Sequence, residues 1–248
     1  IFGIFLLLAA VLAVILLSPP LKCRCTRFFR CRFGDRGISR KFHNAHFLRG
    51  LAMGLASGLT MADALELALM SWGIGAGDAV FVPSFTFMST AEVVASLGAT
   101  PVWVDIDLDT FNMSPVALER AITEIVQQGK LTPKAIIPVD LFGLPADFRN
   151  ILPLARKYGL KVLEDGAQGF GGEINGQRAC SFGDTSTTSF FPAKPLGCYG
   201  DGGAVFTDND EINSLLRSLA VHGKGRQKYE NIRIGRNSRL DSIQAAVL

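Results

Sequence analysis

The sequence predicts an α/β fold, a three-layer α/β/α sandwich in which helices cover both faces of a mostly parallel sheet. Three observations indicate it. From residue 62 onward, short apolar runs alternate with longer helical patterns, as in chains of βαβ units. Hydrophobic residues make up 48% of the chain and 26 residues are glycine, which is typical of a globular α/β domain. Polar residues follow closely after two of the apolar runs, where parallel strands end and active groups gather.

The elements can be placed in order because their ends are marked. Glycines at 73, 98 and 159 end three helices, and Ser114 with Pro115 opens another by a cap and a proline in its first turn. The expected helices are 62–71, 89–97, 115–128, 147–158, 210–220 and one that begins near 239, and the expected strands are 79–83, 101–104, 135–139, 160–163, 186–190 and 204–206. Crossovers between such strands are right-handed.

Two unusual segments precede the predicted domain. Residues 1–20 form an apolar segment whose first 17 residues have no polar side chain; it is a membrane anchor, a signal-peptide core or extraneous sequence. Residues 21–55 are basic and would keep a domain that follows an anchor on the cytoplasmic side. We therefore expect a cytoplasmic domain over residues 56–248. We expect it to be incomplete at its C-terminus, because the helical pattern from Arg239 has no stop signal.

The net charge of +3 is the sum of two unlike parts. Residues 21–50 contain nine Lys or Arg and one acidic residue, whereas residues 51–248 contain 16 basic and 21 acidic residues. The predicted domain is therefore mildly acidic, which argues against a nucleic-acid partner. The five cysteines lack the spacing of a disulfide framework, and neither they nor the three histidines form a metal-binding motif.

Lys194 gives the strongest chemical signal. It lies between two prolines in a segment that ends in a glycine-rich turn, residues 190–203, so its backbone is restrained. An amine that is held still and partly desolvated suits Schiff-base chemistry. Asp165 directly follows an apolar strand, and a lysine and an aspartate at neighbouring strand ends are the two groups that a pyridoxal phosphate (PLP) enzyme requires. Either residue alone would more often be structural.

Several separated segments resemble one known family. They are residues 63–68, 77–87, 138–143, 164–168, 189–203 and 235–241. Together they are similar to the DegT/DnrJ/StrS sugar-nucleotide aminotransferases of the fold-type I PLP enzymes, over roughly residues 62–248. The lysine segment most resembles the branch that aminates 3-keto sugars on UDP-linked hexuronic acids. The resemblance implies the large domain of a PLP transferase, with the family's C-terminal small domain outside the chain.

The resemblance also implies a role for each matching residue. Lys194 would bond to pyridoxal 5'-phosphate and move a proton, Asp165 would pair with the ring nitrogen, Gln168 would bond near the phenolic oxygen, Phe87 would lie on the ring face and Ser189 would bond the phosphate. Asn237 would reach the phosphate in a neighbouring subunit, which implies a homodimer with shared sites.

Two positions depart from the family pattern. The phosphate-binding turn normally contains Gly-Thr or Gly-Ser at the start of a helix, but here Met61 and Ala62 stand directly before Asp63. We still expect Ala62 and Asp63 to lie at the phosphate. Gly166 replaces an alanine that is common in the family.

The resemblance implies transfer of an amino group to a keto group on a nucleotide-linked sugar, and we expect glutamate to be the amino donor. The product would serve polysaccharide or glycoconjugate synthesis. Two alternatives stay open. A PLP-fold sugar dehydratase would have histidine in place of Lys194. A non-catalytic, membrane-tethered relative would account for the apolar residues 1–17 and for the altered phosphate turn.

Overall fold

The computed structural model describes residues 60–248. The predictions for residues 1–20 and 21–55 therefore lie outside the described residues, as does the start of the predicted domain. Within the described range, none of the helices combines the length and the apolar character that a membrane span needs.

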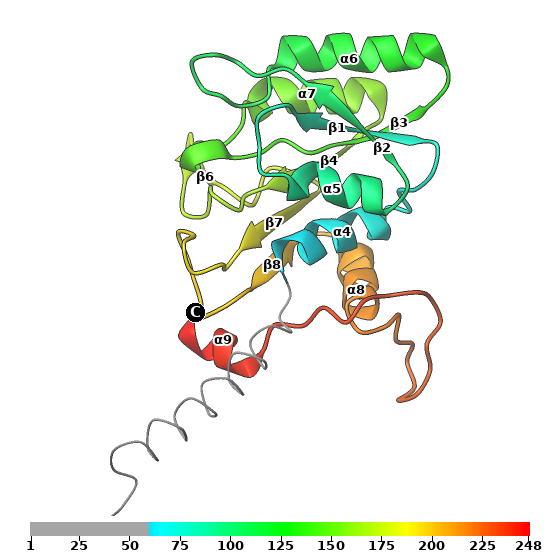
Figure 1. The fold of residues 1–248 in the computed structure, drawn as a ribbon, viewed down its shortest axis with the longest axis vertical. Helices are drawn as coiled ribbons and strands as arrows, with labels where there is room; N and C mark the ends of the chain where they lie inside the picture. Colours follow the sequence, from blue (N-terminus) through cyan, green and yellow to red (C-terminus); the bar gives the residue numbers. More distant parts are fainter. Residues whose placement is uncertain (1–59) are drawn as a thin grey trace, which may run out of the picture. The chain divides into compact units, whose positions relative to one another are not determined.

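Residues 60–248 form one six-stranded sheet with helices packed against it (Figure 1). The helices are α4 (Met61–Ser71), α5 (Ser89–Ser96), α6 (Pro115–Gln128), α7 (Phe148–Tyr158), α8 (Asp210–Leu219) and α9 (Ser242–Val247), with a 3₁₀ turn η1 (Leu141–Gly143). The strands of the sheet are β1 (Asp78–Pro83), β2 (Thr100–Val104), β3 (Thr132–Ile136), β4 (Lys161–Asp165), β7 (Thr185–Ser189) and β8 (Gly203–Phe206). These elements confirm the predicted ones, with ends that differ by at most three residues.

The sheet order is β2-β1-β3-β4-β7-β8. The first five strands are parallel to their neighbours, and only β8 runs antiparallel, against β7. The predicted mostly parallel sheet is thus confirmed. Parallel strands end at one edge of a sheet, so Asp165 at the end of β4 and Ser189 at the end of β7 lie at the same edge.

The core has two apolar layers, one on each face of the sheet. Successive residues of a strand point to opposite faces, and Val80 and Phe81 of β1 accordingly belong to different layers. One layer packs α4 and α5 against the sheet through residues such as Leu65. The other packs α6 and α7 through residues such as Leu118 and Ile151. This arrangement confirms the three-layer sandwich.

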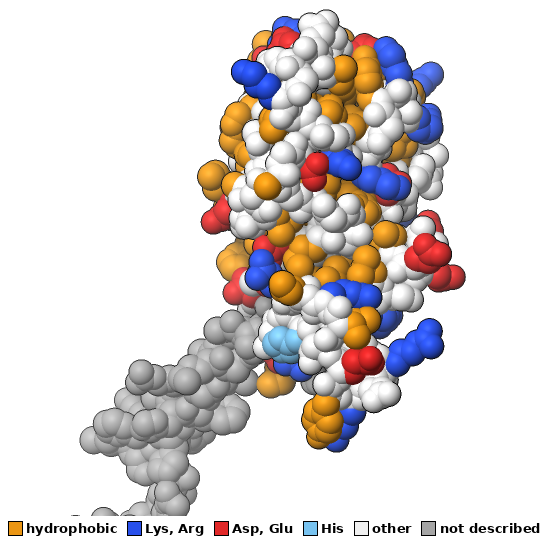
Figure 2. Space-filling model, turned by 90° about the vertical axis from the view of Figure 1, so that its right-hand side faces the viewer, with side chains coloured by type: hydrophobic (Ala, Val, Ile, Leu, Met, Phe, Trp, Pro, Cys, Tyr) orange, Lys and Arg blue, Asp and Glu red, His pale blue; other side chains and the backbone are white. Residues whose placement is uncertain are grey.

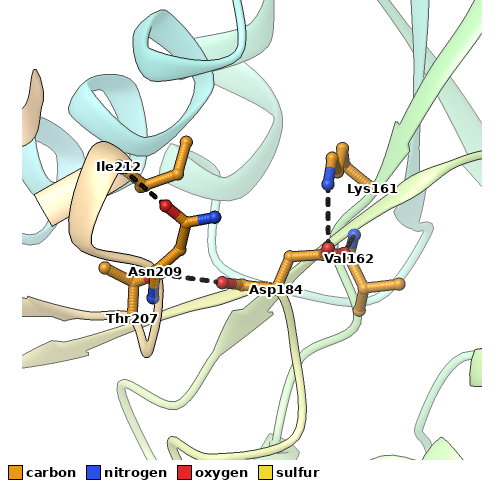
Figure 3. Close-up of polar contacts among 6 residues, drawn as sticks. All are labelled: Lys161, Val162, Asp184, Thr207, Asn209 and Ile212. Atoms are coloured by element: carbon orange, nitrogen blue, oxygen red, sulfur yellow. Dashed lines mark hydrogen bonds and ion pairs between the residues drawn. The ribbon is translucent and has the colours of Figure 1, made fainter.

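Asp184 directly precedes β7 and therefore lies at the opposite edge of the sheet from Asp165, which ends the parallel strand β4. There it joins three elements (Figure 3). Its carboxylate accepts a hydrogen bond from the Val162 amide at 2.9 Å and forms an ion pair with Lys161 at 3.0 Å. The Thr207 hydroxyl donates to the Asp184 carbonyl at 3.1 Å, and Asn209 caps α8 by accepting from the amides of Glu211 and Ile212. The side chain of Asp184 therefore ties β4 to β7 and its backbone ties β7 to the turn before α8.

The structure contains a small hairpin that was not predicted from the sequence. Strands β5 (Glu173–Ile174) and β6 (Gln177–Arg178) pair antiparallel around Asn175 and Gly176. Both turn residues have positive φ, 52° and 80°, and Asn-Gly is the dipeptide that favours such a turn. The signal was present in the sequence, but the two flanking strands are too short to show an alternating pattern.

Charges of both signs are interspersed with exposed apolar side chains on the face shown in Figure 2. Such a mixture gives this face no broad basic surface of the kind that nucleic acids bind. Among residues 60–248, no group of three or more His, Cys, Asp or Glu side chains could hold a metal ion.

Two positions in α6 provide a test of the core. Leu118 is fully buried, whereas Val116 is 82% exposed in the same turn. Truncating Leu118 to alanine leaves a cavity, so we expect Leu118→Ala to lower the free energy of unfolding by about 2–5 kcal/mol. Val116→Ala should change it by less than about 0.5 kcal/mol. Urea denaturation of both variants measures the difference, and equal losses would contradict the assigned packing.

Candidate active site

A cavity of about 490 Å³ opens at the carboxyl edge of the sheet, beside the start of α4. Its lining residues come from α4, the start of α5, the end of β7 and the segment that follows β7: Thr60, Met61, Ala62, Phe87, Ser89, Ser189, Phe191, Ala193, Lys194 and Asp201. Four residues predicted from the sequence therefore line one space, namely Lys194, Ala62, Phe87 and Ser189. The volume suits a small-molecule cofactor.

Lys194 is presented by a loop of residues 190–202, which we call the lysine loop. The loop has no regular secondary structure, and its ends are joined by a bond from the Phe190 amide to the Gly202 carbonyl at 2.7 Å. The buried thiol of Cys198 donates to the Phe190 carbonyl at 3.1 Å, and the Lys194 amide donates to the Phe191 carbonyl at 2.8 Å. These bonds hold the half-buried lysine within the cavity lining.

Asp165 is a buried carboxylate, with 2% of its surface exposed. The Thr90 hydroxyl of α5 donates to its Oδ2 at 3.0 Å, and the Ala167 amide donates to its Oδ1 at 3.2 Å. Burial raises the pKa of Asp165 to about 6, although these two hydrogen bonds and the nearby positive charge of Lys194 act to lower it. At neutral pH Asp165 is therefore mainly an anion, ready to pair with a cation.

The start of α4 offers two backbone donors to the cavity. Thr60 caps the helix, because its hydroxyl accepts from the Asp63 amide at 3.1 Å and its carbonyl accepts from Ala64. The first amides of a helix otherwise lack partners, and within the described residues those of Met61 and Ala62 have none. An anion in the cavity could bind them, with support from the helix dipole.

The other predicted residues differ in their placement. Asp63 does not line the cavity; its carboxylate turns back to accept from the Thr60 amide at 3.0 Å. Gln168 lies outside the lining as well, and its Oε1 accepts from the Phe142 amide at 3.0 Å, which leaves its NH₂ group to donate. Asn237 is exposed, pairs with Val221 in an isolated bridge and is not among the lining residues. Its assignment to a neighbouring subunit stays a prediction.

Phe87 and Ser189 both line the cavity, but they differ in how far they are exposed. Phe87 is 68% exposed, so its ring is available to a planar ligand. Ser189 is buried, and its hydroxyl oxygen accepts from the Phe191 amide at 3.3 Å while its O–H can still donate.

Sequence reasoning missed three polar residues at this edge of the sheet: Thr90, Ser89 and Asp140. Thr90 was one residue of an expected helix, and nothing in the sequence indicates that it bonds a residue 75 positions away. Asp140 lies inside a segment used for the resemblance, but no role was given to it. It is fully buried; the Ala146 amide donates to its Oδ1 at 3.1 Å, and its Oδ2 has no partner among residues 60–248.

Asp140 stands next to two further buried acids, Glu164 and Asp165. Glu164 is well satisfied, since it accepts from the amides of Cys180 and Phe182 and from the Ser186 hydroxyl. Burial raises the pKa of Asp140 to about 9, and the charge of Glu164 adds to the effect. Asp140 is therefore a neutral acid at pH 7, which limits the repulsion on Asp165.

Comparison with known proteins shows the family of this chain. A sequence profile of the DegT/DnrJ/EryC1/StrS aminotransferase family matches residues 41–248. The chain belongs to this family. A UDP-2-acetamido-2-deoxy-3-oxo-D-glucuronate aminotransferase from Pseudomonas aeruginosa is 53% identical over 186 residues, which are 75% of this chain and 50% of that protein. The chain spans about half the length of the curated relatives it matches.

Solved structures of family members share the fold. An aminotransferase of the family from Brucella abortus superposes with a TM-score of 0.76 at 53% identity, over 82% of this chain and 56% of that one. NtdA from Bacillus subtilis, solved with bound cofactor PMP, superposes with a TM-score of 0.68 at 35% identity, over 76% of this chain and 41% of that one. The fold predicted from the sequence is thus also that of family members.

The neutral state of Asp140 predicts how stability depends on pH. The folded protein keeps a proton on Asp140 up to about pH 9, whereas the unfolded chain releases it near the ordinary aspartate pKa of 3.8. The free energy of unfolding should therefore fall as pH rises, by up to about 1.4 kcal/mol per pH unit. Asp165 adds to this slope only below about pH 6.

Asp140→Asn should remove that slope between pH 6.5 and 8.5, because asparagine is neutral and of similar size. Urea denaturation of the wild type and the variant at several pH values measures it. A variant with the same slope as the wild type would show that Asp140 does not hold the proton.

Gly166, beside Asp165, has no room for a side chain. A Cβ at Gly166 would lie 2.4 Å from the Cys180 sulfur, and one at Gly169 would lie 2.5 Å from the Asp140 carboxylate. We expect Gly166→Ala to lower the free energy of unfolding by about 1–3 kcal/mol, and Cys180→Ala to restore most of the loss by removing the sulfur.

Gly169→Ala serves as the matched control, because its clash is with Asp140 and Cys180→Ala should not relieve it. Urea denaturation of the single and double variants gives the coupling energies. Additive losses for Gly166→Ala and Cys180→Ala would disprove the contact.

Proposed function

We propose that the complete protein is a PLP-dependent aminotransferase that aminates a keto group on a nucleotide-linked sugar, with glutamate as the amino donor. The observation that supports it most is the amine of Lys194 in a cavity, close enough to the buried Asp165 for its charge to lower that residue's pKa. Membership of the aminotransferase family and a relative solved with PMP, the amino form of PLP, agree with it.

The residues present fit this cofactor. The lining combines one amine at Lys194, an exposed aromatic ring at Phe87, hydroxyl groups at Ser89 and Ser189, and the start of a helix whose first two amides have no partner among residues 60–248. The amine matches an aldehyde, the aromatic ring matches a planar ring, and the hydroxyl groups together with the helix start match a phosphate. The altered turn at Met61 and Ala62 is compatible with a phosphate, because the donors there are backbone amides and need no particular side chain.

Bound PLP would supply an aldehyde that bonds an amine and a ring that accepts electrons when a neighbouring carbon loses its proton. Lys194 would provide the amine and, once released from the aldehyde, a base that holds and returns that proton at its Nζ atom. Asp165 would hold a proton on a ring nitrogen that faces it. Its hydrogen bond from Thr90 fixes the carboxylate in place.

The substrate proposal follows the most informative relative. The Pseudomonas aeruginosa protein is named for a UDP-linked 3-oxo-glucuronate, and we propose a UDP-linked 3-keto hexuronate as the substrate class for this protein too. The glycoconjugate pathway, the dimer with shared sites, the cytoplasmic placement and the limits of the domain at residues 56–248 remain predictions. Lys194 favours amino transfer over the dehydratase alternative, in which histidine takes its place.

Lys194→Ala tests the proposal. The wild-type protein, incubated with PLP and then reduced with borohydride, should contain one pyridoxyl group on Lys194, detectable by peptide mass spectrometry. It should also transfer nitrogen from ¹⁵N-glutamate to a UDP-linked 3-keto hexuronate. Lys194→Ala should lose both the label at this site and at least about 10³-fold in transfer rate, because the nucleophile is gone.

Lys161→Ala is the control, since Lys161 lies in an exposed ion pair at the far edge of the sheet and should keep both properties. A wild-type protein that takes up PLP only at scattered surface lysines would refute the proposed chemistry. Labelling without transfer to any keto sugar would favour a non-catalytic relative.

A further inference from the structure

We propose that Gln244 is a positioning residue for Lys194, which it serves by anchoring the lysine loop through the backbone amide of Tyr199. The inference rests on the proposed function, because the role of Lys194 does. Gln244 lies in α9, has no exposed surface, and accepts from the Tyr199 amide at 2.8 Å through its side-chain carbonyl. The two residues are 45 positions apart in the sequence.

The lysine loop has few other attachments. Within the described part of the chain, its remaining hydrogen bonds join loop residues to one another or to Ser189 at the end of β7. Among residues 60–248, the bond from Tyr199 to Gln244 is the only hydrogen bond that joins positions 191–201 to a residue beyond 189–203. Apart from its bond to Ser189 at the end of β7, the loop therefore depends on α9 for its polar contact with the rest of residues 60–248.

Gln244 makes this contact at the expense of local bonds. Asp241 and Gln244 are spaced as in a capping box, in which the third helical residue accepts from the amide of the cap residue. Here Asp241 makes no cap bond, and the carbonyl of Gln244 bonds Tyr199 instead. The buried NH₂ group of Gln244 has no acceptor among the described residues, which is unfavourable. A role at the loop accounts for this arrangement, whereas helix capping does not.

Apolar packing brings the same segment to the base of the loop. A Cβ at Gly202 would lie 3.1 Å from the Leu240 side chain, so the chain before α9 touches the point where the loop closes. Figure 1 shows α9 beside the chain that leads from β7 to β8. Leu240 and Gln244 thus hold the loop at two points. A loop freed from one of them would spend more time away from the position that Lys194 needs.

Two variants of Gln244 distinguish the effect of its hydrogen-bond acceptor from the effect of its side-chain shape. Gln244→Met keeps its length and removes the acceptor, and Gln244→Glu restores an acceptor oxygen. In the complete protein, hydrogen–deuterium exchange of peptides covering 191–201 should be about fivefold faster for Gln244→Met, the change expected from one hydrogen bond. The rate of Lys194 labelling by PLP and borohydride should fall by a similar factor. Gln244→Glu should restore both toward the wild type.

Asn209→Ala is the control for general loss of stability, since it removes two cap bonds at α8 and leaves the loop untouched. It should change neither rate. If Gln244→Met exchanges and labels like the wild type, the inference is wrong. If Gln244→Met does not fold, Gln244→Asn takes its place, because its side chain is one carbon shorter and moves the acceptor oxygen away from Tyr199. The exchange rate of residues 191–201 and the rate of Lys194 labelling then decide the question. A wild type without label at Lys194 would count against the proposed function, while slow exchange that depends on Gln244 would still establish the anchor.

Discussion

The structure around the cavity depends on one buried charge, the carboxylate of Asp165. A carboxylate out of contact with water is unfavourable unless donors and cations compensate it. Here the compensation comes from three directions: the Thr90 hydroxyl on α5, the Ala167 amide in the turn after β4, and the charge of Lys194 after β7. Elements far apart in the sequence are thereby brought to one edge of the sheet.

The parallel pairing of β4 with β7 makes this convergence possible. Asp165 lies opposite Thr187, so the chain leaves β7 two residues later at Ser189 and enters the lysine loop beside the buried acid. The turn from Gly166 to Gly169 then leaves room for Asp140 and Cys180. Gly166, which departs from the common alanine, is explained by the Cys180 sulfur, which lies 2.4 Å from the position that an alanine Cβ would take. Burial also raises the pKa of Cys180 to about 12, so this thiol packs and does not react.

Local signals in the sequence were sufficient for most of the fold. Glycines, proline and cap residues mark where helices begin and end, and apolar runs mark the strands, since both depend on residues close together in the chain. The Asn175-Gly176 turn was equally local but was overlooked. The sequence could not have assigned roles to Thr90, Asp140 and Gln244, because each of them acts through a contact with another element. Thr90 contacts β4, Asp140 contacts the turn that follows β4, and Gln244 contacts the lysine loop.

The sequence by itself determined the sandwich and singled out Lys194 and Asp165, because the residues next to them in the chain indicate their roles. Only the tertiary structure decided which side chains surround them. It turned Asp63 back onto Thr60, placed Ala62 in the cavity lining, and set Gln168 and Asn237 outside it. Those outcomes depend on the distance between elements and on competition among hydrogen-bond partners, and neither quantity is a property of a single stretch of chain.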